Sequence, residues 1–257
     1  MKCYNCKAKL SEMDSCPKCG TDVRLYKKIV YTSNRYYNSA LMRAKGRDLS
    51  GAAEDLRVCL QLNKHHIAAR NLLGLIYYET GEAAAALKEW ITSKNLKYRN
   101  NIADQYIQDL RENKNTLDSF DHTIRKFNQA LEYAQSGSKD MAIIQLKKVI
   151  SVNHRMIKAY ELLALLYIDS HEYKKAEAVL NRCLEIDSGN VCALSYKKEL
   201  KRIEKNYKDP NKREVVGDSE REEVIIPVKL RDFGSYLTSS LYILIGVILA
   251  AGLIYYV

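Results

Sequence analysis

Apolar and small residues recur along the middle of the chain at two spacings. Residues 25–206 follow the three-to-four-residue period of helix faces almost throughout. A longer repeat is superimposed on it, and one copy is marked by Gly74, Tyr77, Gly81, Ala86 and Trp90. Equivalent residues in the other copies are Ala40, Ala52 and Leu56; Ala130, Tyr133, Gly137, Ala142 and Leu146; and Ala164, Tyr167, Ala176 and Leu180. The first copy lies 34 residues before the second, and the third 34 residues before the fourth. A period of about 34 residues predicts an array of stacked helix pairs.

The marked copy reads L-G-x-x-Y-x-x-x-G-x-x-x-x-A-x-x-x-W, which resembles the tetratricopeptide repeat. The resemblance implies an all-α superhelix with a concave groove. Small Gly and Ala side chains would let the helices of a pair approach closely, and Tyr and Trp would fill the gaps between pairs. The predicted solenoid occupies residues 25–206, with repeats at about 33–66, 67–100, 123–156 and 157–190.

Two segments of the solenoid depart from the repeat. Corresponding residues of the second and third copies lie 56 rather than 34 positions apart, so residues 101–122 are an insertion. It is interpreted either as an extra or lengthened helix packed on the array, or as a coiled-coil-like docking face for a partner. Residues 191–206 are apolar on one side and Lys-rich on the other, which predicts a cap helix.

Residues 233–257 contain no charged side chain and predict a transmembrane helix. Within them, Leu237–Val257 would extend about 31 Å as a helix, which matches a hydrocarbon core of about 30 Å. The alternative is a buried helix of a soluble core. Lys229 and Arg231 precede the segment, so the positive-inside rule predicts a single-pass protein of the cell membrane with its N-terminal region in the cytoplasm. The chain would end as a tail anchor or continue across the membrane.

The chain is basic, with 41 Lys and Arg against 31 Asp and Glu. This excess admits nucleic acid, anionic lipid or acidic protein as partners and does not choose among them. A cluster at 197–213 holds eight basic and three acidic residues and leads into a charged linker at 207–232. The cluster is either a solvated helix surface or a contact for anionic lipid headgroups.

Four cysteines near the N-terminus form two C-x-x-C pairs, Cys3 with Cys6 and Cys16 with Cys19, in a segment of residues 1–24. Four thiolates can surround one Zn²⁺ as a tetrahedron, and about 24 residues cannot fold without such a cross-link. Gly20 after the second pair permits the tight turn that aims backbone N–H groups at the sulfurs. The segment resembles a zinc ribbon with one structural Zn²⁺. The alternative is a pair of redox dithiols or disulfides, which a reducing cytoplasm disfavours.

We find no catalytic constellation and expect no enzyme. The other cysteines, Cys59, Cys183 and Cys192, are expected to be packing residues. The tetratricopeptide resemblance implies peptide binding by first-helix side chains on the concave side; the alternative for each is a packing or solvated role. In this chain these are Asn34, Tyr37, Leu41, Asn71, Leu75, Tyr78, Phe127, Leu131, Lys158 and Glu161. Because Tyr37 and Leu41 replace the Lys and Asn of the family's carboxylate clamp, binding of chaperone C-termini is not expected.

Three functions are consistent with these features. The first is a membrane-anchored cytoplasmic scaffold that recruits a protein or peptide through the repeat groove. The second is a membrane-tethered zinc ribbon that binds nucleic acid, which is disfavoured because the ribbon has no aromatic-basic recognition strand. The third is a zinc- or redox-responsive regulator of partner binding. A ribbon and a cytoplasmic region before a single span also resemble bacterial membrane proteins, especially Gram-positive ones.

Overall fold

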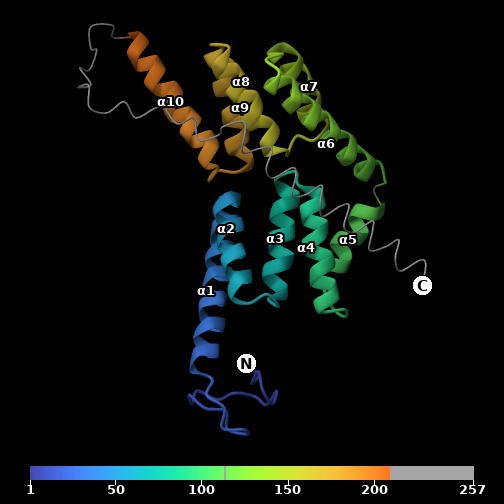
Figure 1. Ribbon diagram of the computed structural model, residues 1–257, viewed down its shortest axis with the longest axis vertical. Helices are drawn as coiled ribbons and strands as arrows, with labels where there is room; N and C mark the ends of the chain where they lie inside the picture. The colour runs from blue at the N-terminus through green and yellow to red at the C-terminus, as the bar shows by residue number, and fades with distance from the viewer. Residues whose placement is uncertain (113, 209–257) are drawn as a thin grey trace. The chain divides into compact units, whose positions relative to one another are not determined.

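The computed structural model describes residues 1–112 and 114–208, and Met1–Lys205 form one compact unit (Figure 1). The described residues contain ten α-helices, and their only β-structure is two isolated bridges near the cysteines. The helices are α1 (Arg24–Lys45), α2 (Leu49–Leu62), α3 (Ile67–Glu79), α4 (Ala83–Leu96), α5 (Ala103–Glu112), α6 (Lys114–Gln135), α7 (Lys139–Val152), α8 (Ile157–Asp169), α9 (Tyr173–Ile186) and α10 (Val191–Lys208). The prediction of an all-α helical-repeat fold is confirmed.

Helices pack in pairs, α1 with α2, α3 with α4, α6 with α7 and α8 with α9 (Figure 1). The residues that mark the sequence repeat form the core of these pairs. Ala52 and Leu56 are fully buried, and so are Ala142 and Leu146 of the third copy and Ala176 and Leu180 of the fourth. A helix pair cannot bury its apolar stripe alone, so α2 packs on α3 and α7 on α8.

The predicted insertion at 101–122 comprises α5 and the first nine residues of α6. Asn101 fixes its start: the side-chain amide donates to Ser93 Oγ (3.1 Å) and Lys97 O (3.2 Å), and its oxygen accepts from Ala103 N (3.1 Å). α6 has 22 residues, like α1, and both begin nine residues before their predicted repeats. Each half of the array therefore starts with a lengthened first helix.

Trp90 in α4 packs against Gly74 in α3, and its indole N–H donates to Asn71 O (3.2 Å). A Cβ at position 74 would lie 2.3 Å from Trp90 Nε1, so only glycine fits beside the ring. Gly74 is therefore required because α3 and α4 pack closely at this position.

We expect Gly74→Ala to lower the free energy of unfolding by about 2 kcal/mol. Displacing Trp90 costs more than the roughly 1 kcal/mol that alanine gains over glycine in a helix. Urea unfolding followed by the fluorescence of Trp90, the only tryptophan of the chain, measures the change. Gly46→Ala is the control, since its Cβ would meet nothing closer than 3.4 Å and should change stability by less than about 0.5 kcal/mol. Equal effects of the two substitutions would contradict this packing argument.

Turns of the first two repeats contact turns of the last two. The carboxylate of Asp187, between α9 and α10, accepts hydrogen bonds from the backbone N–H groups of Leu49 (2.8 Å) and Ser50 (3.2 Å) and from the Ser50 hydroxyl. Next to it, Ser188 N donates to Arg47 O (2.9 Å). The first turn of α2 is thus capped by a residue from 137 positions later in the chain.

A second set of contacts joins the turn between α3 and α4 to the turn between α7 and α8. Ile157 N donates to Thr80 O (3.4 Å), and the side chain of Asn153 donates to Gly81 O (3.3 Å). Arg155 forms an ion pair with Glu79 at 2.8 Å. The sequence repeat indicates only how neighbouring helix pairs stack. Neither set of contacts between distant turns is therefore predicted from it.

None of the described helices is long and apolar enough to cross a membrane. The predicted transmembrane helix at 233–257 and residues 209–232 of the predicted linker lie outside the described residues.

Candidate metal centre and repeat surface

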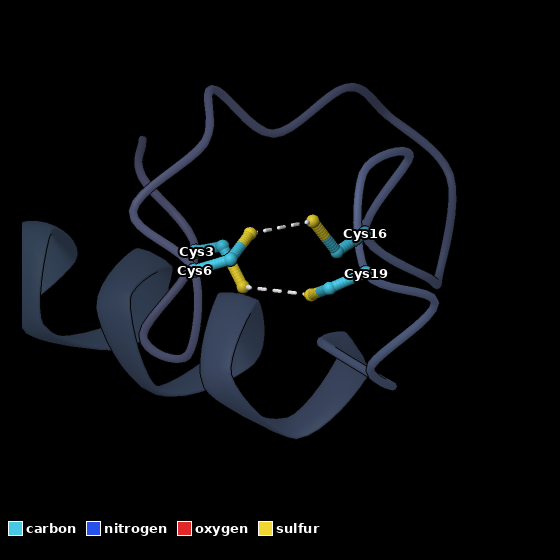
Figure 2. Close-up of side chains that lie close together, drawn as sticks. All are labelled: Cys3, Cys6, Cys16 and Cys19. Atoms are coloured by element: carbon cyan, nitrogen blue, oxygen red, sulfur yellow. Dashed lines mark hydrogen bonds between the residues drawn. The ribbon is translucent and has the colours of Figure 1, made fainter.

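The side chains of the four N-terminal cysteines, which precede α1 in the chain, come together (Figure 2). Their sulfurs all lie within 4.8 Å of one another, with Cys3 Sγ 3.8 Å from Cys19 Sγ and Cys6 Sγ 3.6 Å from Cys16 Sγ. Thiolates about 2.3 Å from one ion at the corners of a tetrahedron are separated by about 3.8 Å. A disulfide would bring two sulfurs to about 2.05 Å. The four side chains therefore have the geometry of a metal site.

Two matching turns position these cysteines. Lys7 N donates to Cys3 O (3.1 Å), and Gly20 N donates to Cys16 O (2.9 Å) thirteen residues later. Lys7 and Gly20 both adopt positive φ, 61° and 68°. The role of Gly20 is evident from sequence, but Lys7 holds the same backbone conformation without being glycine, so composition does not reveal it.

Polar neighbours surround the exposed sulfur of Cys19. Its Sγ lies 3.2 Å from the hydroxyl of Thr21, which also accepts a hydrogen bond from Asn5 Nδ2 (3.1 Å). Hydrogen bonds from the Thr21 hydroxyl and backbone N–H lower the pKa of Cys19 to about 6. The backbone N–H of Ala8 lowers the pKa of Cys6, but the hydrogen bond with Cys19 and burial raise it overall, to about 11. Cys19 is the readier of the two to act as a thiolate ligand.

The cysteine segment is fastened to α1. Val23, immediately before the helix, is fully buried against Cys3 and Cys16. One turn into the helix, the buried Lys27 ammonium donates to Ser11 O (2.6 Å) and Met13 O (2.7 Å) in the loop between the two cysteine pairs. Sequence reasoning missed Lys27 because one lysine among many gives no signal of burial.

The predicted groove residues of the first repeats differ in exposure. On α1, Asn34 is exposed, whereas Tyr37 and Leu41 are half-buried. The ring of Tyr37 lies 4.9 Å from that of His66, between centroids. Some of the predicted groove residues on α1 therefore also pack against neighbouring side chains.

The predicted groove residues on α3 are half-buried. Asn71 donates to Asn101 Oδ1 (2.9 Å) at the start of the insertion. Leu75 and Tyr78 pack on the cluster around Trp90, and the Arg155 guanidinium lies 5.5 Å from the Tyr78 ring centroid. The structure thus brings Leu75 and Tyr78 together on one cluster.

In the third and fourth repeats the predicted residues fall into two groups. Phe127 and Leu131 on α6 are buried. On α8, the exposed Lys158 lies 3.4 Å from Glu82, and the carboxylate of Glu161 accepts a hydrogen bond from Asn190 (2.8 Å). Burial raises the pKa of Glu161. Lys158 and Glu161 therefore already have partners within the chain.

The family model of the tetratricopeptide repeat matches residues 157–190. This segment is similar to a tetratricopeptide repeat. It comprises α8 and α9 and has the bounds of the fourth repeat predicted from the sequence. No curated protein matches the chain at a significant level.

Several solved helical-repeat structures are similar to the chain at low sequence identity. A structure described as the functional characterisation of Pseudomonas aeruginosa pilF is 17% identical, with a TM-score of 0.32, over 68% of this chain and 93% of that one. YrrB, described as a TPR protein with an unusual peptide-binding site, is 18% identical, with a TM-score of 0.30, over 68% and 98%. The TPR domain of P58(IPK) is 16% identical, with a TM-score of 0.37, over 70% of this chain and 48% of that chain.

Proposed function

We propose that the protein is a membrane-anchored scaffold whose helical repeats recruit a protein partner to the cytoplasmic face of the cell membrane. The observation that carries the proposal is the repeat array itself, with a segment similar to a tetratricopeptide repeat at residues 157–190. Repeats of this kind act by binding polypeptide segments rather than by catalysis. In the part of the chain that the structure describes, one cluster of four cysteines could hold a metal ion. Four cysteine ligands complete a tetrahedral coordination shell, which is typical of a structural ion.

The membrane part of the proposal rests on the uncharged run Leu237–Val257. Its length suits one crossing, and Lys229 and Arg231 before it favour a cytoplasmic N-terminal region. The repeats would then act next to the bilayer, where a tethered scaffold concentrates its partner.

We further propose that Cys3, Cys6, Cys16 and Cys19 bind one structural Zn²⁺. Four cysteine sulfurs within 4.8 Å of one another, two pairs of them 3.6 Å and 3.8 Å apart, suit this ion. The thiolates would hold the two turns of the segment together in place of a hydrophobic core, since the segment buries only Cys3, Cys16 and Val23 fully.

The repeat surface is tested with the full chain solubilised in detergent. We expect Asn34→Ala combined with Leu41→Ala on α1 to lower recovery of the specific partner at least about tenfold, the loss expected when two side chains contribute about 0.7 kcal/mol each. The measurement is quantitative mass spectrometry of co-purified proteins against the unaltered chain. Only proteins depleted by this variant count as groove partners.

The matched control is Arg35→Ala combined with Met42→Ala. These residues have the same seven-residue spacing on α1 and are exposed, but they face about 100° away from Asn34 and Leu41. This variant should recover the partner normally. If both pairs of substitutions leave every co-purified protein unchanged, binding through this surface of α1 is refuted.

A zinc- or redox-responsive regulator is a second candidate, because Lys27 fastens the cysteine segment to the helix that carries Asn34, Tyr37 and Leu41. Loss of the metal would release the constraint on the first turns of α1. Repeating the capture with Cys16→Ser decides between the two functions: a plain scaffold retains its partner, whereas a metal-responsive regulator loses it.

A further inference from the structure

The helix α10 closes the described part of the chain and has two opposite faces. Ala193, Tyr196 and Leu200 are buried against the repeats. At 100° per residue these three side chains lie within about 60° of one another around the helix. They mark the side of α10 that is buried.

The side opposite the buried one is apolar at its start and basic beyond it. Val191 and Leu194 are 74% and 48% exposed. Lys198, Lys201 and Lys205 follow at positions 7, 10 and 14 after Val191, on the same side of the helix, and all three are exposed. We call these five residues the α10 outer face.

No acidic side chain interrupts the α10 outer face. Glu199 and Glu204 lie about 80° and 140° from Val191 around the helix. Glu199 pairs with Arg202 at 3.7 Å, and Lys197 donates to Asn181 Oδ1 (2.6 Å). Lys198, Lys201 and Lys205 form no ion pair within residues 1–205. Three ammonium groups and two exposed aliphatic side chains thus share one surface.

We propose that the α10 outer face lies on an anionic phospholipid bilayer. Lipid phosphates complement the three lysines, and Val191 and Leu194 would enter the boundary between headgroups and acyl chains. A solvated helix explains the lysines but not two neighbouring exposed aliphatic residues. A nucleic acid backbone would likewise contact only the lysines.

The position of α10 in the chain supports the same occupant. Twenty-eight residues, 209–236, separate Lys208 from the uncharged run Leu237–Val257. Such a segment reaches at most about 100 Å, so an anchored chain cannot carry α10 far from the membrane surface. This step rests on the proposed membrane anchoring; the exposure and charge of the helix do not.

The test uses the full chain carrying Leu194→Trp, reconstituted into vesicles with brominated acyl chains. Trp90 is buried and contributes a constant background. We expect bromine to quench the new tryptophan in vesicles of phosphatidylglycerol and phosphatidylcholine. Quenching should be much weaker in phosphatidylcholine alone or at high salt, which screens the charges. Ile91→Trp on α4, with 41% exposure, is the positional control and should stay unquenched.

Charge reversal tests the role of the lysines. Each lysine near an anionic surface contributes roughly fivefold to membrane partitioning, so Lys198→Glu, Lys201→Glu and Lys205→Glu together should abolish the quenching of Trp at 194. The control carries Lys64→Glu, Lys88→Glu and Lys148→Glu, three exposed lysines outside α10, and has the same net charge. It should be quenched like the parent.

Co-flotation of the protein with vesicles tests the proposed membrane anchor separately from the α10 contact. A chain that floats with neutral vesicles contains a working anchor, whatever the tryptophan reports. Quenching in anionic vesicles supports the α10 contact even if flotation with neutral vesicles fails. If the protein floats with anionic vesicles but its tryptophan at 194 is not quenched, the proposed α10 contact is overturned. Equal quenching in neutral and anionic lipid overturns it as well. A concentration-dependent blue shift of the Leu194→Trp emission without lipid would instead assign the face to a second copy of the chain and overturn the proposal.

Discussion

Replacing Cys16 by serine is expected to remove the bound metal and unfold the segment 1–23 while the helical repeats stay folded. Cys16 is one of the two buried cysteines of the cluster, with its sulfur 3.6 Å from that of Cys6. Substitutions of groups that only support a ligand lower metal affinity 10–100-fold, so loss of a ligand should exceed about 100-fold. The zinc content of the purified full chain measures the loss directly.

The repeats should survive because their cores do not include the cysteine segment. Leu56 and Trp90 are buried among helical residues of the first and second repeats. Hydrogen exchange should therefore become fast in residues 1–23 and around Lys27, which loses its acceptors at Ser11 and Met13, and remain slow in α2 to α4.

Cys192→Ser is the matched control for this prediction. Cys192 is half-buried on α10 and lies outside the cysteine cluster, so the variant should keep the metal and the slow exchange of residues 1–23. If the Cys16→Ser variant binds zinc as tightly as the unaltered protein, the four sulfurs are not the zinc ligands. The same follows if the unaltered protein contains no zinc.

Local chemistry is the part of this protein that the sequence predicts well. The two C-x-x-C pairs indicate a shared cluster because their spacing allows four sulfurs to meet, and the structure brings them together. Cys59 and Cys183, expected in the core from their common repeat position, are fully buried, and burial raises the pKa of Cys183 to about 12. In each case a short-range pattern carries enough information.

Groups that depend on distant neighbours are not predicted. A repeat position indicates which face of a helix a residue occupies but not what covers that face, so it does not reveal that Phe127 and Leu131, predicted to face the groove, are buried. Asp187 occupies the same repeat position as Asn153 in the preceding repeat, and nothing local distinguishes them. What differs is the partner: Asp187 meets α2, and Asn153 meets Gly81.

That difference predicts a large effect for Asp187→Ala, a loss of about 3 kcal/mol in the free energy of unfolding. The carboxylate is fully buried and accepts from Leu49 N, Ser50 N and the Ser50 hydroxyl. Its removal leaves two backbone N–H groups at the first turn of α2 without this acceptor, and hydrogen bonds to charged groups contribute about 1.5–3 kcal/mol. The positive end of the helix dipole also loses its countercharge.

Asp187→Asn and Asn153→Ala calibrate the measurement, which is urea unfolding of the full chain in detergent. The amide of Asp187→Asn keeps one acceptor oxygen, so the loss should be about half that of alanine. Asn153 contributes neutral hydrogen bonds to Gly81 O (3.3 Å) and from Arg155 N (3.2 Å), so its replacement should cost about 1 kcal/mol. This order, with faster hydrogen exchange at Leu49 and Ser50 only in the Asp187 variants, is expected if Asp187 joins the two halves of the array. A change for Asp187→Ala no larger than that of an ordinary surface substitution, about 0.5 kcal/mol, would mean that the halves are held together by other contacts.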